Sequence, residues 1–229
     1  MKKGLLALGT SLLLALFSVG ALAEGQATIT QQTAQTYAYE DVFYAYYFAQ
    51  IENTGDVPIV LDGGTLELYN SEGQAIYSTP VYSCYPSVLA PGEKGFVREY
   101  TNLDSLNTMA AYKFDLVARP AGEGSVIRLN CTADFSQQTL YGDDMSTTLK
   151  ATVMNDKQET VSNIMIVYAL YDAEGKLIFV DTLSPYYLGI PAGNSVELST
   201  AVDPEIEASW AERGIRPASA YALAYIIAD

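Results

Sequence analysis

Carboxylates are the most numerous side chains in this sequence that could do chemistry. They gather in three places: Glu40-Asp41, Asp143-Asp144, and Asp203 with Glu205 and Glu207. Oxygen ligands of this kind hold Ca²⁺, and two carboxylates at a suitable separation hydrolyse glycosidic bonds. No cluster has the spacing of a calcium loop, however, and nothing singles out one pair among 27 acidic residues. We therefore expect solvated loops, no metal site and no catalytic residues.

Other catalytic chemistries lack the residues that they need. The chain contains no His, which removes Ser-His-Asp and Cys-His arrangements and every His-containing zinc site. Two Cys are too few for a four-thiolate metal site, and no glycine-rich phosphate loop or G-x-S-x-G elbow occurs. The sequence thus predicts a protein that is not an enzyme and that has no cofactor.

Tyrosine is the side chain that stands out for recognition. Of 18 Tyr, four near the start of the first copy that the second copy does not repeat lie close together: Tyr37, Tyr39, Tyr44 and Tyr46. Tyr offers a rigid ring and a hydroxyl, which suits a binding surface. Strand alternation would point Tyr44 and Tyr46 away from the Tyr47 side. We interpret this set as a possible recognition surface; ordinary filling of strands is the alternative.

The first residues predict export. Lys2 and Lys3 precede an uncharged apolar run from Leu5 to Val19, and Ala21-Leu22-Ala23 provides an A-x-A cleavage signature. An uncleaved membrane anchor is the alternative, since Gly4 to Ala23 is just long enough to span a bilayer. We expect a cleaved signal peptide at 1–23, an extracellular or cell-envelope location, and no membrane span after cleavage.

The rest of the chain contains one unit twice. LELYNSEGQAI at 66–76 matches YALYDAEGKLI at 168–178, and Asn53 matches Asn155 at the same offset. A period near 100 residues indicates a duplicated domain rather than a solenoid. Between the copies, 120–125 has the Pro and Gly content of a linker. We predict domain 1 at 24–119, the linker at 120–125 and domain 2 at 126–229.

Each copy is expected to be all-β. A period of two marks one strand in each copy. In the first, Tyr47, Ala49 and Ile51 alternate with Phe48, Gln50 and Glu52; in the second, Leu149, Ala151 and Val153 alternate with Lys150, Thr152 and Met154. The repeated segment is interpreted as a hairpin whose turn, 70–73 or 172–175, has Gly at a position of positive φ. Its acidic residues would then cap a turn, without a chemical role.

One short helix is predicted before the last strand of the second copy. Asp203 can serve as its N-cap, Pro204 fits the first turn and Gly214 can end it. A shorter counterpart would lie near Asp104 to Met109. The overall prediction is two tandem immunoglobulin-like antiparallel β-sandwich domains.

The stretch QIENTGDVPIVLDGGTLELYNSEGQ, followed by LAPGEKGF, resembles the FxLYD family of bacterial extracytoplasmic domains. The family's hairpin motif corresponds to Leu66-Glu67-Leu68-Tyr69-Asn70 and to Tyr168-Ala169-Leu170-Tyr171-Asp172. Neither copy has the family's Phe, and the first lacks its Asp. The resemblance implies a small exported sandwich whose molecular role is generally uncharacterised, and it brings no catalytic residues.

Cys84 and Cys131 are the two cysteines, one in each predicted domain. Export would place them where disulfides form, and a bond between them would contribute about 4 kcal/mol on the chain-entropy model. Two unrelated thiols are the alternative, because the sequence does not give their Cα separation. The sequence slightly favours the disulfide.

Charge and composition limit the partners. The leader holds two of the 12 basic residues and none of the 27 acidic ones, so the remaining chain has a net charge of −17 (10 − 27). Such a chain is repelled by nucleic acid and anionic membranes. We expect a non-enzymatic module that binds a protein or cell-envelope partner, with its oligomeric state left open. A structural spacer and, less favoured, a carboxylate-based hydrolase are the alternatives.

Overall fold

The structure is a computed structural model that describes residues 25–39, 42–103, 109–121, 126–139 and 145–227. The predicted leader at 1–23 lies outside these residues. So do the acidic pairs Glu40-Asp41 and Asp143-Asp144, residues 104–108 of the expected shorter helix, and 122–125 of the predicted linker. We call residues 25–121 the N-terminal half and residues 126–227 the C-terminal half.

The described N-terminal half consists of two antiparallel sheets packed face to face. One sheet has the strand order β1-β2-β7-β5; in the other, β3 pairs with β4 and β6 and also with β8. The strands are β1 (Ala27–Tyr39), β2 (Val42–Asn53), β3 (Ile59–Tyr69), β4 (Ala75–Val81), β5 (Cys84–Tyr85), β6 (Val88–Leu89), β7 (Lys94–Leu103) and β8 (Ala111–Pro120). The last strand thus includes Pro120, the first residue of the predicted linker.

The C-terminal half repeats this plan with one connected sheet, β12-β11-β14-β9-β10-β13. Strand β9 pairs with β14 through Ile127–Leu129 and with β10 from Asn130 onward, so it passes from one layer of the sandwich to the other. The elements are β9 (Ile127–Thr139), β10 (Met145–Met154), β11 (Ile164–Tyr171), β12 (Leu177–Leu183), β13 (Ser195–Ala201), α1 (Pro204–Arg213) and β14 (Ser219–Ile226).

These elements confirm the predicted fold class. The described chain is all-β and antiparallel, and its helix α1 precedes the last strand. Asp203 is the N-cap of α1, with extended backbone and no side-chain cap hydrogen bond, and Gly214 ends the helix in the left-handed conformation. Both hairpin turns also match expectation, since Gly73 and Gly175 have φ of 77° and 76°. In the second turn, Asp172 Oδ1 accepts hydrogen bonds from the backbone N–H of Glu174 and Lys176, so this carboxylate caps a turn.

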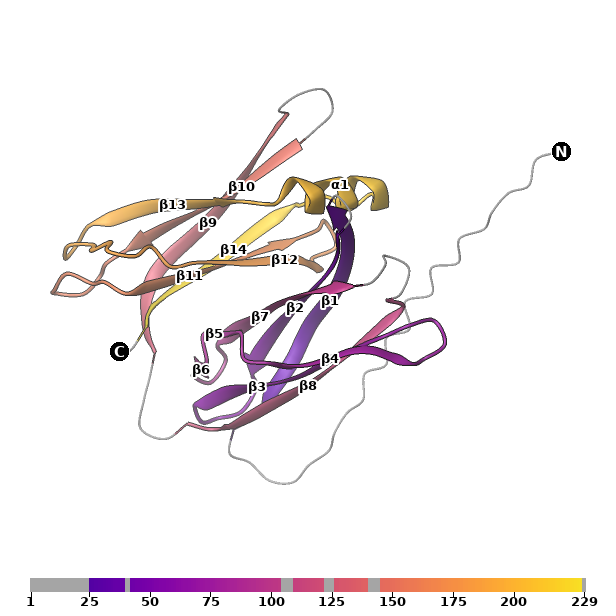
Figure 1. The fold of residues 1–229 in the computed structure, drawn as a ribbon. Helices are drawn as coiled ribbons and strands as arrows, with labels where there is room; N and C mark the ends of the chain where they lie inside the picture. Colours follow the sequence, from indigo (N-terminus) through magenta and orange to yellow (C-terminus); the bar gives the residue numbers. More distant parts are fainter. Residues whose placement is uncertain (1–24, 40–41, 104–108, 122–125, 140–144, 228–229) are drawn as a thin grey trace.

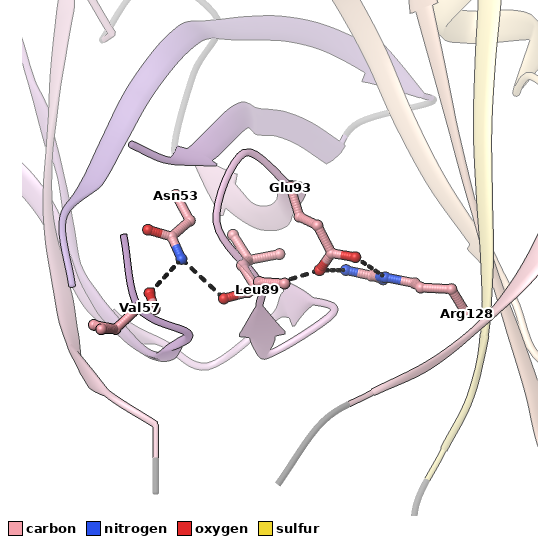
Figure 2. Close-up of polar contacts among 6 residues, drawn as sticks. Asn53, Val57, Leu89, Glu93 and Arg128 are labelled. Carbon is pink, nitrogen blue, oxygen red and sulfur yellow. Dashed lines mark hydrogen bonds and ion pairs between the residues drawn. The ribbon is translucent and has the colours of Figure 1, made fainter. Parts of the chain in front are cut away.

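A buried asparagine fixes the same turn in each half. Asn53 Nδ2 donates to the carbonyl oxygens of Val57 (2.8 Å) and Leu89 (3.0 Å), as Figure 2 shows. In the C-terminal half, Asn155 Nδ2 donates to those of Glu159 (2.7 Å) and Ile190 (2.8 Å). Because unpaired buried carbonyls are costly, one side-chain amide in each copy stabilises both the turn that follows it and the segment that holds Leu89 or Ile190.

The two halves pack as four stacked layers (Figure 1). From the C-terminal half to the N-terminal half, these are β9-β10-β13, β14-β11-β12, β1-β2-β7 and β3-β4-β8, and β12 contacts β1, β2 and β7. Phe48 of β2 is fully buried, and its ring lies 5.5 Å from that of Phe179 of β12. Since Tyr47 and Phe48 point to opposite faces, both faces of β2 are buried, and the halves share a hydrophobic core.

The outer faces of the corresponding strands β2 and β10 differ, because only β2 is covered by the other half. Phe48 corresponds to Lys150 at the repeat offset, and Gln50 corresponds to Thr152. Phe48 and Gln50 are buried beneath the C-terminal half, whereas Thr152 is exposed and Lys150 forms a surface ion pair with Glu197. The inner face is therefore apolar in both of the corresponding strands β2 and β10, while only β2 also has an apolar outer face.

Polar side chains fasten the interface between the halves. Gln35 of β1 is 5% exposed; its Nε2 donates to Ile178 O (2.6 Å), and its Oε1 accepts from Trp210 Nε1 (2.8 Å). At the other end of the interface, Arg128 donates two hydrogen bonds to the carboxylate of Glu93, 3.0 and 2.7 Å (Figure 2). These bonds lower the pKa of Glu93, although its partial burial opposes the effect.

Candidate functional site

The expected tyrosines gather on the outer face of the β1-β2-β7 sheet. Tyr37 of β1 lies directly opposite Tyr44 of β2, and Tyr46 of β2 lies opposite Tyr100 of β7. Their rings form a stacked row: the centroids are 5.1 Å apart for Tyr37–Tyr44, 5.5 Å for Tyr37–Tyr46 and 5.6 Å for Tyr46–Tyr100. Cross-strand aromatic pairs of this kind stabilise a sheet, and here they extend the interface beyond Phe48.

This row lines an open cleft to which both halves contribute. We define the tyrosine cleft as the residues that line it: Tyr37, Tyr44, Tyr46, Arg98, Tyr100 and Glu205. Its volume is about 490 Å³. Five of these residues come from the N-terminal half and Glu205 comes from the first turn of α1, so the cleft requires the packing of the halves.

The guanidinium of Arg98 is held among rings and one carboxylate. It lies 5.3 Å from the centroid of Tyr46 and 5.9 Å from that of Tyr100, where a cation is attracted to the ring faces. Its Nε is 3.5 Å from Asp181 Oδ1 of β12, an ion pair that joins the halves. Arg98 therefore has a fixed place in the cleft and a charge that is partly balanced.

The hydroxyl of Tyr37 is a neutral hydrogen-bonding group of the cleft. Burial, together with a hydrogen bond to Tyr46, raises the pKa of Tyr37 far above its ordinary value. The hydroxyl of Tyr37 stays protonated at physiological pH and can donate as well as accept hydrogen bonds.

The sequence had indicated three of the six residues that line the cleft. Tyr37, Tyr44 and Tyr46 lie together there, and Tyr39 ends β1 with a side chain outside the described residues. Tyr44 and Tyr46 face away from Tyr47 as expected, but Tyr46 is only 7% exposed because Arg98 and the neighbouring rings cover it.

Arg98, Tyr100 and Glu205 were missed as part of this site. Tyr100 could have been found by pairing the strand that follows LAPGEK with the strand of Tyr46, since alternation places both on one face. No sequence signal would have brought Glu205 to this place, because it arrives through the packing of the C-terminal half.

The third acidic cluster does not converge on a metal site. Glu205 lines the cleft. Glu207, on the buried side of α1, instead accepts a hydrogen bond at Oε1 from the backbone N–H of Thr147. Within the described ranges, no three Asp, Glu or Cys side chains are grouped closely enough to hold a metal ion.

Both cysteines are free thiols in the structure, which differs from the expected disulfide. Cys84 of β5 packs into the core of the N-terminal half, and Cys131 of β9 packs against the shared core. Their side chains thus belong to different cores. Burial raises the pKa of each thiol to about 11. The halves are held by the contacts of the shared core.

A second hollow of about 460 Å³ lies along the interface, lined in part by Lys94, Arg128 and Tyr221. Its cations are already engaged: Arg128 pairs with Glu93, and Lys94 lies 5.9 Å from the centroid of the Tyr221 ring. The tyrosine cleft is therefore the stronger candidate for a binding site.

Comparison with known proteins gives no family for the chain. No family model and no curated protein matches it. Among solved structures, a calcium-binding mutant of Bacteroides uniformis beta-glucuronidase 2 is 12% identical with a TM-score of 0.26, over 79% of this chain and 28% of that chain. The coconut allergen cocosin is 10% identical with a TM-score of 0.12, over 86% of this chain and 85% of that chain. Likenesses this low bear on neither fold nor function.

The helix content adds one finding about membranes. In the part of the chain that the structure describes, no helix combines the length and the apolar character that crossing a bilayer requires.

Proposed function

We propose that this chain is an exported, non-enzymatic binding module of two sandwich domains, and that it recognises cell-envelope material or an envelope protein through the tyrosine cleft. One observation supports this most: three tyrosines expected from the sequence, with Tyr100, Arg98 and Glu205, line one open cleft. Rigid aromatic side chains with polar ends are typical of recognition surfaces. The A-x-A leader and the resemblance to FxLYD domains support an extracytoplasmic location.

Tyr100 is the residue best suited to test this proposal. It is 53% exposed, so truncating it removes a contact surface while the core stays filled. Its matched control is Tyr82, which is 79% exposed and does not line the cleft.

The experiment measures how much envelope material the purified, immobilised protein retains from the producing cells. We expect Tyr100→Ala to lose most of the retention and Tyr82→Ala to keep it. Tyr82→Ala should unfold at the wild-type temperature and Tyr100→Ala slightly below it, because one cross-strand ring pair is lost. Equal retention by wild type and Tyr100→Ala would reject the cleft as the site, and hydrolysis of any envelope polymer by the pure protein would reject a non-enzymatic role.

A further inference from the structure

We infer that the ligand of the tyrosine cleft is a neutral glycan chain. This inference rests on the proposed function and names the chemical class that the cleft would bind. It is argued from three properties of the cleft: its mixture of donors and acceptors, its balanced charge and the exposure of its rings.

The hydrogen-bonding groups of the cleft are mixed. Four phenol hydroxyls each donate and accept, the Arg98 guanidinium only donates, and the carboxylate of Glu205 only accepts. An anionic ligand would need mainly donors, and a cationic ligand would need mainly acceptors. A ligand that carries many hydroxyls, each both donor and acceptor, matches this mixture. Carbohydrates are that class of ligand.

The charges of the cleft nearly cancel. Arg98 and Glu205, the two charged residues that line the cleft, carry opposite charges, and Asp181, 3.5 Å from the guanidinium, leaves one negative charge in excess. A polycation would meet Arg98 at the centre of the ring row. A polyanion would be repelled by a chain whose formal net charge is −15. A neutral ligand meets neither penalty.

The rings leave one platform for stacking. Tyr46 is contacted by Tyr37, Tyr100 and Arg98 and is 7% exposed, so its faces are occupied. Tyr100, at the β7 end of the row, is 53% exposed and offers apolar ring surface to solvent. The C–H face of one sugar ring can pack on Tyr100 while its hydroxyls reach the other phenols. Because the cleft is open, a longer chain can pass across it.

The experiment titrates the full exported protein with defined probes by calorimetry. The probes are soluble neutral glucans and N-acetylhexosamine oligosaccharides, with polylysine and polyglutamate as charged comparisons. We expect binding of a neutral oligosaccharide that changes less than about twofold between low and high salt, because no ion pair with the ligand is screened. Tyr44→Phe, which removes one hydroxyl, should weaken it about fivefold, and Tyr100→Ala should weaken it more. Tyr82→Phe is the control.

Chemical treatment of the envelope material tests the same inference without a chosen sugar. Periodate cleaves the vicinal diols of 1,4-linked glucans but spares internal 1,4-linked N-acetylhexosamine units. Material treated with periodate and then with N-acetylhexosaminidases should therefore no longer be retained, whereas protease-digested material should be retained as before. Two results would overturn the inference that the ligand is a glycan. One is salt-sensitive binding of polylysine or polyglutamate alone; the other is retention that survives the treatment of the glycans and is lost after protease digestion. In either case retention that still depends on Tyr100 leaves the proposed function standing.

Discussion

Asn53 and Asn155 show at the scale of single residues how this fold is held. Each is fully buried, donates twice to backbone carbonyls and accepts once, from the N–H of Gly55 or of Lys157. Replacing either by Ala removes three hydrogen bonds with backbone groups, although Ile190 O keeps its bond from the N–H of Val161. We expect Asn53→Ala and Asn155→Ala each to lower the free energy of unfolding by about 3 kcal/mol, measured by urea denaturation.

Asn194 provides the control for this pair. Its side chain is exposed and makes one hydrogen bond, to Ala192 O. Asn194→Ala should change the free energy of unfolding by less than about 0.5 kcal/mol. Losses of similar size in all three variants would show that the buried asparagines have no special role.

A second prediction at the residue scale concerns the reactivity of the two thiols. Because burial raises the pKa of Cys84 and Cys131 to about 11, both are protonated in the folded protein at pH 8. The nucleophile is the thiolate, so labelling by a maleimide should be slow in the folded protein and fast in guanidinium. A raised folded pKa stabilises the fold below pH 9 and loses this contribution as pH rises toward 11. Detection of a disulfide by mass spectrometry of the unreduced protein would contradict the free thiols.

Helix α1 is the element that completes the cleft, and a buried carboxylate anchors it. Burial raises the pKa of Glu207, although the hydrogen bonds with Thr147 oppose the effect. Its Oε2 is buried without a hydrogen-bond partner among the described residues. With a raised folded pKa, Glu207 contributes stability below its unfolded pKa and loses it as pH rises through the folded value.

Glu207→Gln should therefore reduce the loss of stability as the pH rises above about 4.3, the ordinary pKa of a Glu carboxyl, because the amide keeps an acceptor for the Thr147 N–H and carries no charge. Thermal unfolding across this range provides the measurement. Glu212→Gln, on the exposed side of the same helix, should leave the pH dependence unchanged. A steeper loss of stability in Glu207→Gln would mean that the anionic form anchors the helix.

The whole molecule depends on the core that the two halves share. Phe48 is fully buried against Phe179 of the other half. Lys150, at the same place in the repeat, is partly exposed. We expect Phe48→Ala to cost about 3–5 kcal/mol and Lys150→Ala less than about 0.5 kcal/mol, measured by urea denaturation of the full chain. Similar small effects at both positions would indicate that the halves are independent.

Most of the fold could be predicted from the internal repeat and from local patterns in the sequence. Alternation around Tyr47 and the turn at Gly73 predict strands and hairpins, because period and turn chemistry are local properties. The burial of Phe48 and Tyr46 could not be read in this way, since both alternate correctly for a solvent-facing side. Only the docking of the C-terminal half buries them.

The residues of the cleft, too, could be predicted from the sequence only in part. Tyr37, Tyr44 and Tyr46 were visible because the second copy does not repeat them, whereas Glu205 joins them through contact between the halves. A comparison of the two copies held a further signal: Phe48 and Tyr46 correspond to Lys150 and Thr148. An outer face that is apolar in β2 and polar in the corresponding strand β10 indicates that something covers this face of β2.

Hydrogen exchange with and without envelope material tests the central claim most directly, because it locates a ligand without altering the protein. The account predicts new protection in the segments that carry the cleft, around Tyr44 to Tyr46 and Arg98 to Tyr100, and none in the exposed β13. Protection confined to the outer face of β9-β10-β13, with the cleft unchanged, would contradict it.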